Sequence, residues 1–260
     1  MYTVLEEGRT RYNVKPMKST EFDSEENTNK CGSLERIDVL MVSKEKKTQI
    51  GAVTVNNING VKLNLTKQEL NEVYKLRYSV YVEELKYHQP YADHKSKMLK
   101  DPLDRAGNLF GLFKNNEAIG TVLSNYVKHS DLGFYLELYK MKELVNSSYY
   151  DSSISTRLIV KKEFRSTSVA FRLALATYIQ GLKDNVQFDF VDCTHGMISF
   201  FVRLGYKLYQ ESMHHPAFGH GAVLVLELQN IAHLEECDSP FAKHYRKIMH
   251  EKNTAIANCL

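Results

Sequence analysis

The chain has 260 residues, 43% of them hydrophobic, which is enough for one large domain or for one domain with extensions. A net charge of +3 does not indicate nucleic-acid binding, and the four widely spaced cysteines favour reduced thiols over disulfides or a zinc site. We expect a cytoplasmic protein, because no apolar run is long enough to span a bilayer and the N-terminus lacks a signal-peptide core.

The N-terminal part of the chain predicts an extension followed by a hairpin. Residues 1–48 are polar and rich in Ser, Thr, Glu and Asn, so we expect a partly ordered arm with one short ordered segment at 37–42. Residues 50–58 and 61–65 are two apolar runs that Asn59-Gly60 can join as a tight turn. The first regular element of the main domain is therefore expected to be a β-hairpin.

A helix is predicted to begin at Thr66. Thr66 and Glu69 have the spacing of a capping box, and a buried stripe follows, formed by Leu70, Val73, Val80 and Tyr81. Arg77 and Glu84 come seven and fourteen residues after Leu70, so they lie on or beside this stripe. A charge on a buried stripe usually has a partner or a function, although an arginine that snorkels at the stripe's edge is equally compatible.

The next segment predicts a long loop and a second hairpin. Residues 86–106 contain two prolines and several polar groups, and loops of this length in compact domains are often functional. Apolar runs at 108–114 and 118–126 flank Asn115-Asn116, which is a favourable two-residue turn.

A strand, a basic turn and a helix then form the central unit of the chain. Residues 154–160 are rich in β-branched side chains, and an apolar stripe at helical spacing starts near 166–168. Lys161, Lys162 and Arg165 lie between the two. A helix N-terminus beside basic side chains suits an anion, although an ordinary solvated turn accounts for the same pattern.

The remaining elements and the domain boundaries follow from the same patterns. We expect helices at 136–145, 196–204 and 239–252, and strands at 187–193, 205–210 and 222–228. The expected organisation is a polar extension over 1–48, a main domain over 49–230 and a helical extension over 231–260.

Two clusters of reactive side chains are set aside. His214, His215 and His220 do not have a known zinc spacing, so no metal is expected. Cys193 and His195 are nearly adjacent in sequence, whereas catalytic pairs are normally assembled from distant segments. A packed or solvated pair is the simpler interpretation.

The order of these elements resembles that of the GCN5-related N-acetyltransferase (GNAT) family. Residues 164–170 (FRSTSVA) are similar to the family's pyrophosphate loop, with Ser168 where glycine is usual. Residues 198–206 (ISFFVRLGY) are similar to a second family element, with Phe201 where many members carry a general-acid tyrosine. The resemblance implies an α/β, GNAT-like fold with a mixed, mostly antiparallel central sheet, splayed at its middle and flanked by helices.

A narrower resemblance covers the first helix and two later motifs. Residues 76–85 (LRYSVYVEEL) look like a signature of N-acyl amino acid synthases and acyl-homoserine-lactone (autoinducer) synthases. Asp101-x-x-Asp104 and Thr156-Arg157 resemble two further motifs of these groups. Ile154 stands where autoinducer synthases often carry a glutamate, which argues against lactone chemistry and leaves the N-acyl amino acid branch open.

The resemblance implies an N-acyltransferase that moves a medium- or long-chain acyl group to the amino group of an amino acid or related small amine. The donor would be acyl carrier protein or acyl-coenzyme A, so an acyl-phosphopantetheine arm is a substrate and no tightly bound cofactor is expected. Its phosphate would meet the N-terminus of the second long helix. The implied donor-binding residues are Arg165, Ser166, Thr167, Ser168, Val169 and Ala170.

The attacking amine must be neutral, so a base is needed, and the carboxylates are candidates. Guanidinium groups suit carboxylates, either of the substrate or of the protein, and backbone N–H groups of the central strand can stabilise the oxyanion. The implied catalytic residues are Glu84, Asp101, Asp104 and Arg157. The implied substrate-binding residues are Arg77, Tyr81, Thr156 and Leu158.

Two alternatives remain open. The first is a coenzyme A-dependent acetyltransferase of a small amine or a protein lysine, which would work without carrier protein. The second is a non-catalytic protein that binds acyl groups or a partner, which Ser168 and Phe201 suggest. Turnover that depends on Asp101 and Asp104 would exclude the second alternative.

Overall fold

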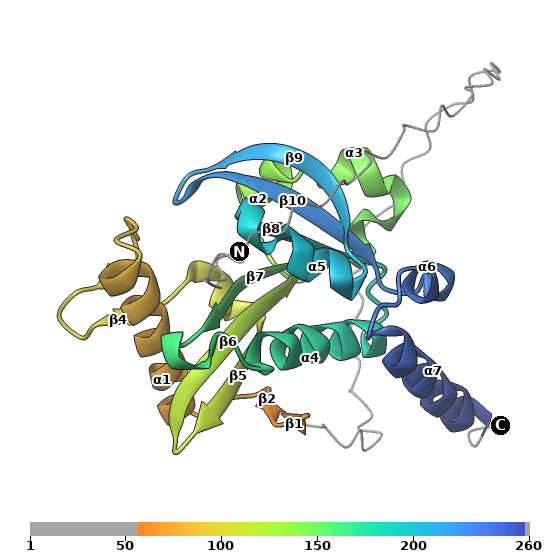
Figure 1. Cartoon of the computed structure of the whole chain (residues 1–260), viewed down its shortest axis with the longest axis horizontal. Coiled ribbons are helices and arrows are strands. Elements are labelled where there is room, and N and C mark those ends of the chain that lie inside the picture. The colour runs from red at the N-terminus through yellow and green to blue at the C-terminus, as the bar shows by residue number, and fades with distance from the viewer. Residues whose placement is uncertain (1–56, 258–260) are drawn as a thin grey trace, which may run out of the picture. The chain divides into compact units, whose positions relative to one another are not determined.

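The protein is represented by a computed structural model that describes residues 57–257. Its central sheet has eight strands in the order β1-β2-β5-β6-β7-β8-β10-β9 (Figure 1). Neighbouring strands are antiparallel except β7 and β8, which are parallel. The sheet is therefore mixed and mostly antiparallel, as predicted. The expected arm over 1–48 and its segment at 37–42 lie outside the described residues.

The strands are β1 (Asn57–Ile58), β2 (Val61–Lys62), β5 (Asn108–Lys114), β6 (Glu117–Tyr126), β7 (Ser152–Val160), β8 (Phe188–Cys193), β9 (Lys207–His215) and β10 (Gly219–Glu227), with a separate pair β3 (Ala92–Asp93) and β4 (Met98–Leu99). The helices are α1 (Lys67–Tyr78), α2 (Tyr135–Leu138), α3 (Met141–Val145), α4 (Val169–Lys183), α5 (Ile198–Leu204), α6 (Ile231–Glu236) and α7 (Ala242–Ala257). None of these helices is long and apolar enough to cross a membrane.

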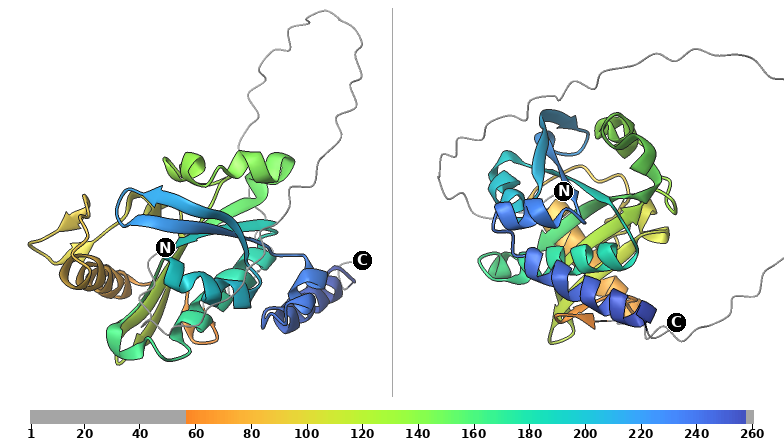
Figure 2. Two further views of the ribbon diagram at one scale, coloured as in Figure 1. Left: turned by 45° about the horizontal axis from the view of Figure 1, so that its top comes forward. Right: turned by 90° about the vertical axis from the view of Figure 1, so that its right-hand side faces the viewer.

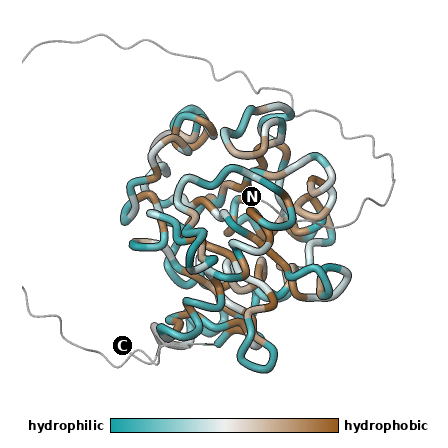
Figure 3. The backbone as a smooth tube through the Cα atoms, turned by 90° about the vertical axis from the view of Figure 1, so that its left-hand side faces the viewer, coloured by the Kyte–Doolittle hydropathy of each residue, from teal (hydrophilic) through white to brown (hydrophobic). Residues whose placement is uncertain are grey.

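Helices α1 and α4 cover opposite faces of the sheet. Phe110 and Val122 pack with α4, whereas their strand neighbours Leu109 and Leu123 pack with α1. This division follows from the alternation of side chains along β5 and β6. Figure 2 shows the long, curved hairpin of β9 and β10, which forms one edge of the sheet. In Figure 3 the hydrophobic residues gather in the interior and the peripheral loops are mainly hydrophilic.

The local signals for α1 are confirmed. The Thr66 hydroxyl accepts a hydrogen bond from the backbone N–H of Glu69, and the Glu69 carboxylate accepts one from the N–H of Thr66. The buried face includes Val73 and Arg77, whose guanidinium has no exposed surface. Arg77 is thus a buried charge and not a side chain that snorkels at the edge. A π-helical turn, Ser79–Glu84, continues the helix and changes its spacing.

The predicted hairpin at Asn115-Asn116 is confirmed. Strands β5 and β6 pair from Asn108 with Ser124 to Lys114 with Glu117. Asn115 and Asn116 both have positive φ angles, 51° and 64°, as a type I′ turn requires. The turn residues therefore suit the register in which β5 pairs with β6.

The sheet opens between β7 and β8. These parallel strands pair only from Ser152 with Phe188 to Ile154 with Phe190. Beyond that point β8 continues along β10, and β7 continues along β6. Strand β7 also contains a bulge at Arg157, which adopts a left-handed φ of 57°. The strands consequently diverge toward the end of β7 that leads to α4, which is the expected splay.

Several boundaries differ from those expected. The helix predicted at 136–145 is broken into α2 and α3, because Lys140 adopts a left-handed conformation with φ of 47°. Strand β9 runs on to His215, since its polar second half pairs with β10. The predicted loop at 86–106 contains the β3–β4 pair and a 3-10 turn. Helix α6 lies in the extension expected to be helical over 231–260 but was not predicted as a separate element, and Asn230 caps it.

Candidate functional site

A cavity of about 480 Å³ lies at the splayed side of the sheet. Four segments from distant parts of the sequence enclose it together with the Arg157 side chain of β7. The lining residues are His88, Gln89, Pro90, Tyr91, Asp101, Pro102, Leu103, Asp131, Leu132, Gly133, Phe134, Tyr135, Arg157, His215, Pro216 and Ala217. The wall is mostly apolar, with one guanidinium and a few polar groups, as in many small-molecule sites.

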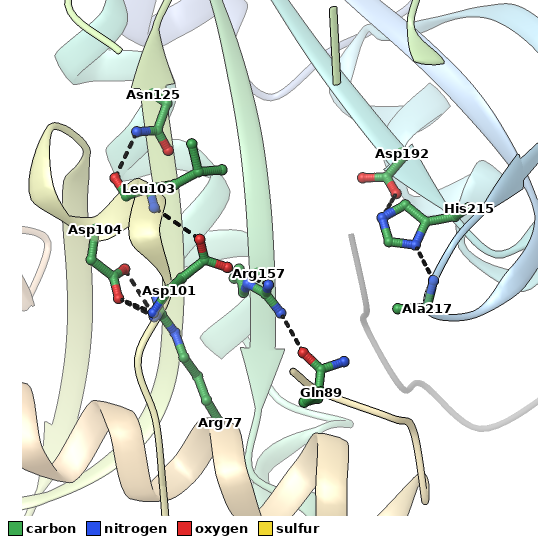
Figure 4. A network of polar contacts seen from close by, with 10 residues as sticks. All are labelled: Arg77, Gln89, Asp101, Leu103, Asp104, Asn125, Arg157, Asp192, His215 and Ala217. Atoms are coloured by element: carbon green, nitrogen blue, oxygen red, sulfur yellow. Dashed lines mark hydrogen bonds and ion pairs between the residues drawn. The ribbon is translucent and has the colours of Figure 1, made fainter. Parts of the chain in front are cut away.

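Arg157 is the cationic group of the cavity. Its Nη2 forms an ion pair with Asp101, and its Nη1 lies 3.4 Å from the Gln89 amide oxygen (Figure 4). The Tyr81 ring lies beneath it, with 5.2 Å between the guanidinium and the ring centroid. Burial alone would lower the pKa of Arg157, but the Asp101 carboxylate raises it. Arg157 therefore remains charged while 12% of its side chain is exposed.

Asp101 and Asp104 form a capping box around a 3-10 turn, Pro102–Arg105. The Asp101 carboxylate accepts from the N–H of Leu103 at 2.9 Å, and the Asp104 carboxylate accepts from the N–H of Asp101 at 2.8 Å. Nη1 of Arg77 donates to both oxygens of Asp104 at 2.8 Å (Figure 4). The Asp-x-x-Asp motif thus joins α1 to β7 through two arginines, and Asp101 is the member that reaches the cavity.

Glu84 and the predicted donor loop meet each other. Both oxygens of Glu84 accept from Nη1 and Nη2 of Arg165 at 2.6 Å, and Nε of Arg165 lies 3.2 Å from the carbonyl oxygen of Val160. The pairing with Arg165 lowers the pKa of Glu84. Glu84 does not line the cavity. The structure thus places it against the loop that precedes α4.

The residues before α4 present backbone groups to solvent. Ser166, Thr167 and Ser168 are exposed, and the N-cap residue Ser168 makes no side-chain capping bond, while the N–H of Val169 donates to the Thr167 hydroxyl at 3.4 Å. Arg165 is buried in its pairing with Glu84, so its charge supports the loop from inside. Lys161 pairs with Glu117 at 2.7 Å, and Lys162 is exposed. The N-terminal N–H groups of α4 remain suited to an anion.

The other predicted substrate residues do not line the cavity. Tyr81 has no exposed surface, and burial raises the pKa of its hydroxyl. Thr156 is buried beside Arg157 on β7, and Leu158 is part of the core that packs on α4. The Arg77 side chain also has no exposed surface, and its guanidinium pairs with Asp104.

A second polar group, of which His215 lines the cavity, was missed by sequence reasoning. The Tyr139 hydroxyl donates to Asp192 at 2.7 Å, and Nε2 of His215 lies 3.8 Å from the other oxygen of Asp192. The backbone N–H of Ala217 donates to Nδ1 of His215 at 3.1 Å (Figure 4). The available signal was the alternation in β8, which puts Asp192 on the same face as Phe190.

The cysteine and histidine clusters have other roles. Burial raises the pKa of the Cys193 thiol to about 12, which keeps it protonated and unsuited to nucleophilic attack. His195 is exposed and bonds the Glu211 carbonyl at 3.2 Å. Within residues 57–257, no three His, Cys, Asp or Glu side chains gather as metal ligands would.

The splayed sheet, the cavity beside its opening and the exposed helix N-terminus after β7 define a GNAT-like acyltransferase fold. A sequence profile described as N-acyl amino acid synthase FeeM matches residues 72–227. This is more than half of the chain, so the chain belongs to the FeeM family of N-acyl amino acid synthases and is an N-acyltransferase. No curated protein sequence matches the chain.

Solved structures show the same fold at low sequence identity. FeeM, an N-acyl amino acid synthase from uncultured soil microbes, matches with a TM-score of 0.52 and 13% identity over 71% of this chain and 98% of its own. TofI, solved in a ternary complex with an inhibitor and MTA, matches with a TM-score of 0.53 and 15% identity over 69% of this chain and 95% of its own. The AHL synthase LasI matches with a TM-score of 0.51 and 18% identity over 65% of this chain and 89% of its own.

Proposed function

We propose that this N-acyltransferase moves a medium- or long-chain acyl group from acyl carrier protein, or from acyl-coenzyme A, to the amino group of an amino acid. The observation that carries the proposal is the position of Arg157. Its guanidinium lies on a cavity wall at the opening between β7 and β8. An amino acid can bind there by its carboxylate, with its amine directed toward a thioester that lies in the opening.

The donor arm is proposed to enter along β7. The ladder between β7 and β8 ends at Ile154, so the following part of β7 does not bond β8. This edge leads to Ser166, Thr167 and Ser168 and to the first N–H groups of α4, where a phosphate is stabilised by backbone donors and the helix dipole. Exposed Lys162 adds positive charge to the face that would meet an acidic carrier protein.

The bulge in β7 is proposed to hold the reacting carbonyl. Arg157 takes a left-handed conformation there, and Leu158 follows it at the opened edge of the strand. A backbone N–H directed at the thioester oxygen stabilises the tetrahedral oxyanion without reorganisation. The amine attacks the carbonyl carbon, the C–S bond breaks, and the amide product leaves together with the free thiol.

The proposal is tested by incubating the purified protein with decanoyl carrier protein, decanoyl-coenzyme A or acetyl-coenzyme A and a panel of amino acids. Products are identified by mass spectrometry. We expect an N-decanoyl amino acid from a long-chain donor. Product from acetyl-coenzyme A alone would favour the acetyltransferase alternative, and no product with any donor would contradict the proposal.

A variant of Arg157 tests the acceptor orientation. Each amino acid is compared with the amine that lacks its carboxylate. The natural enzyme is expected to prefer the amino acid, and Arg157→Met is expected to lose most of this preference, roughly 10- to 100-fold in kcat/KM. Arg172→Met is a matched control, because the Arg172 guanidinium donates to the carbonyl of Asn59 and does not line the cavity. An unchanged preference in Arg157→Met would contradict carboxylate binding.

A further inference from the structure

Gln89 lies in the wall of the cavity, on the segment between the π-helical turn and β3. A β-turn begins at this residue, because the N–H of Ala92 donates to its carbonyl oxygen at 3.1 Å. Pro90 takes the second position of the turn, where its fixed φ is favourable, and it also restricts the backbone of Gln89. At the start of the segment, the N–H of Tyr87 donates to the carbonyl oxygen of Tyr81 at 2.9 Å. The backbone position of Gln89 is therefore set by the turn itself.

The contact with Arg157 determines which way the Gln89 amide faces. Nη1 of Arg157 lies 3.4 Å from the amide oxygen of Gln89. A guanidinium group can only donate, so the atom that faces it must be the oxygen, and the amide nitrogen then points elsewhere. Figure 4 shows this nitrogen directed away from Arg157, toward the side on which His215 is drawn. His215 also lines the cavity.

The amide nitrogen of Gln89 is buried and has no hydrogen-bond partner among residues 57–257. Gln89 as a whole is 8% exposed. A buried N–H donor without an acceptor is unfavourable, and folded proteins normally pair such groups. Two nitrogens of Arg77 are also buried without a partner in this part of the chain, but Arg77 does not line the cavity, whereas Gln89 does. A ligand oxygen in the cavity can therefore supply the acceptor that Gln89 lacks.

We propose that Gln89 binds the acceptor amino acid, with its amide nitrogen donating to one carboxylate oxygen while Arg157 donates to the other. The inference rests on the proposed acyl transfer and on carboxylate binding at Arg157. Because the Arg157 guanidinium also pairs with Asp101, it is not free to grip both oxygens of a second carboxylate. Gln89 supplies the second donor. A carboxylate held at two points has a fixed orientation, which directs the neighbouring amine toward the thioester.

The pairing of Gln89 with Arg157 also defines the class of acceptor. A free carboxylate offers an acceptor oxygen to each of the two donors. The α-amide of the same amino acid offers one oxygen and one NH₂ group, so it leaves one buried donor unpaired and brings a donor against it. A site built to hydrogen-bond a substrate group rejects the analogue that lacks this group. The acceptor is therefore a free amino acid, and an amino acid amide or a protein lysine is a poor substitute.

The decisive measurement compares kcat/KM for an amino acid with kcat/KM for its α-amide, in the natural enzyme and in Gln89→Glu. The natural enzyme is expected to prefer the amino acid. Gln89→Glu keeps an oxygen for Arg157 and changes the other end of the side chain from a donor into a charged acceptor. This end repels a carboxylate and accepts from the NH₂ group of the amide. We expect the preference for the amino acid over the amide to fall by about 100-fold.

Two further variants separate this role from a structural one. Gln89→Met removes the donor at similar side-chain length and adds no charge, so it provides the test even if Gln89→Glu does not fold. It should raise KM for the amino acid about 10-fold and change KM for the amide by less than about twofold. Gln229→Glu is the matched control, because it adds the same charge at an exposed position that does not line the cavity. Its preference should equal that of the natural enzyme.

The outcomes distinguish this inference from the proposed function. If the natural enzyme is active and both Gln89 variants keep its preference, the role of Gln89 is overturned and acyl transfer stands. An equal loss for the amino acid and the amide in Gln89→Met would also overturn it, because a residue that only supports the cavity wall affects both acceptors alike. A natural enzyme without product from any donor would overturn the proposed function and the role of Gln89 together. A selective loss for the amino acid, absent from Gln229→Glu, supports the assignment.

Discussion

Arg77 and Asp104 form a buried ion pair in which one guanidinium nitrogen, Nη1, donates to both carboxylate oxygens at 2.8 Å. The arginine side chain has no exposed surface and that of the aspartate is 10% exposed. Asp104 also accepts from the backbone N–H of Asp101, which in turn pairs with Arg157 at the cavity. The pair therefore fixes the loop that carries Asp101, the ion-pair partner of Arg157.

Removing the charge of Asp104 is expected to destabilise the protein strongly. Asp104→Asn leaves Arg77 buried without its counter-charge, and breaking such a pair costs about 3–5 kcal/mol. This loss of stability is measured as the change in the free energy of unfolding in urea denaturation. Asp238→Asn, at an exposed position, is the control and should change this free energy by less than about 0.5 kcal/mol. A cost below about 1 kcal/mol for Asp104→Asn would show that water compensates Arg77.

The pairing of Glu84 with Arg165 predicts an effect on the acyl donor. Glu84→Gln removes the negative charge that orients Arg165 and the loop before α4. Because the Glu84 side chain is 30% exposed, solvent screens the pair, and we expect a loss of about 1 kcal/mol, or a roughly fivefold rise in KM for the donor. Steady-state kinetics with varied donor measure this change.

The same kinetics test whether Glu84 is a base. A positioning role leaves kcat at saturating donor and its pH profile unchanged, whereas a base would lower kcat and remove the acid limb of the profile. Glu83→Gln is the matched control. Glu83 is the neighbouring residue in the sequence, and its carboxylate pairs with exposed Lys97 at 2.9 Å. A kcat that falls in Glu84→Gln but not in Glu83→Gln would indicate that Glu84 is a catalytic base.

Local signals predicted elements better than they predicted the site. The capping box at Thr66 and the turn at Asn115-Asn116 act within a few residues, so the sequence alone identified both. The expectation that Glu84 lies on or beside the buried stripe assumed regular helical spacing, which the π-helical turn Ser79–Glu84 changes. Asp192 and His215 come together only through the register of β8, β10 and β9, and no local pattern encodes that contact.

The Asn115-Asn116 turn predicts a stability difference between substitutions. Asn116 has a φ of 64°, which glycine adopts freely and a β-branched residue resists. Asn116→Gly should keep or slightly raise the free energy of unfolding, and Asn116→Val should lower it by about 1–2 kcal/mol. Thermal denaturation of both variants measures the difference. Equal stability of the two would indicate that the loop relaxes into another turn.

The buried carboxylate of Asp189 predicts a pH-dependent stability. It accepts hydrogen bonds from Ser153 at 2.6 Å, Ser155 at 3.0 Å and Tyr206 at 2.6 Å, and these lower its pKa, yet burial outweighs them and raises the pKa to about 6. The native state therefore binds a proton more tightly than the unfolded chain. The resulting stabilisation is complete below the unfolded pKa of about 4 and is lost as pH rises through 6.

Replacing this carboxylate by an amide removes the titration at Asp189. From pH 5 to pH 7.5 the free energy of unfolding of the natural protein should fall by about 1–2 kcal/mol relative to that of Asp189→Asn. The difference between the two proteins, measured by urea denaturation at each pH, isolates this group from all others. Because both proteins share every other titrating group, a difference that is constant between pH 5 and 7.5 would mean that Asp189 is already ionised at pH 5. Hydrogen bonds from Ser153, Ser155 and Tyr206 would then outweigh the burial of the carboxylate.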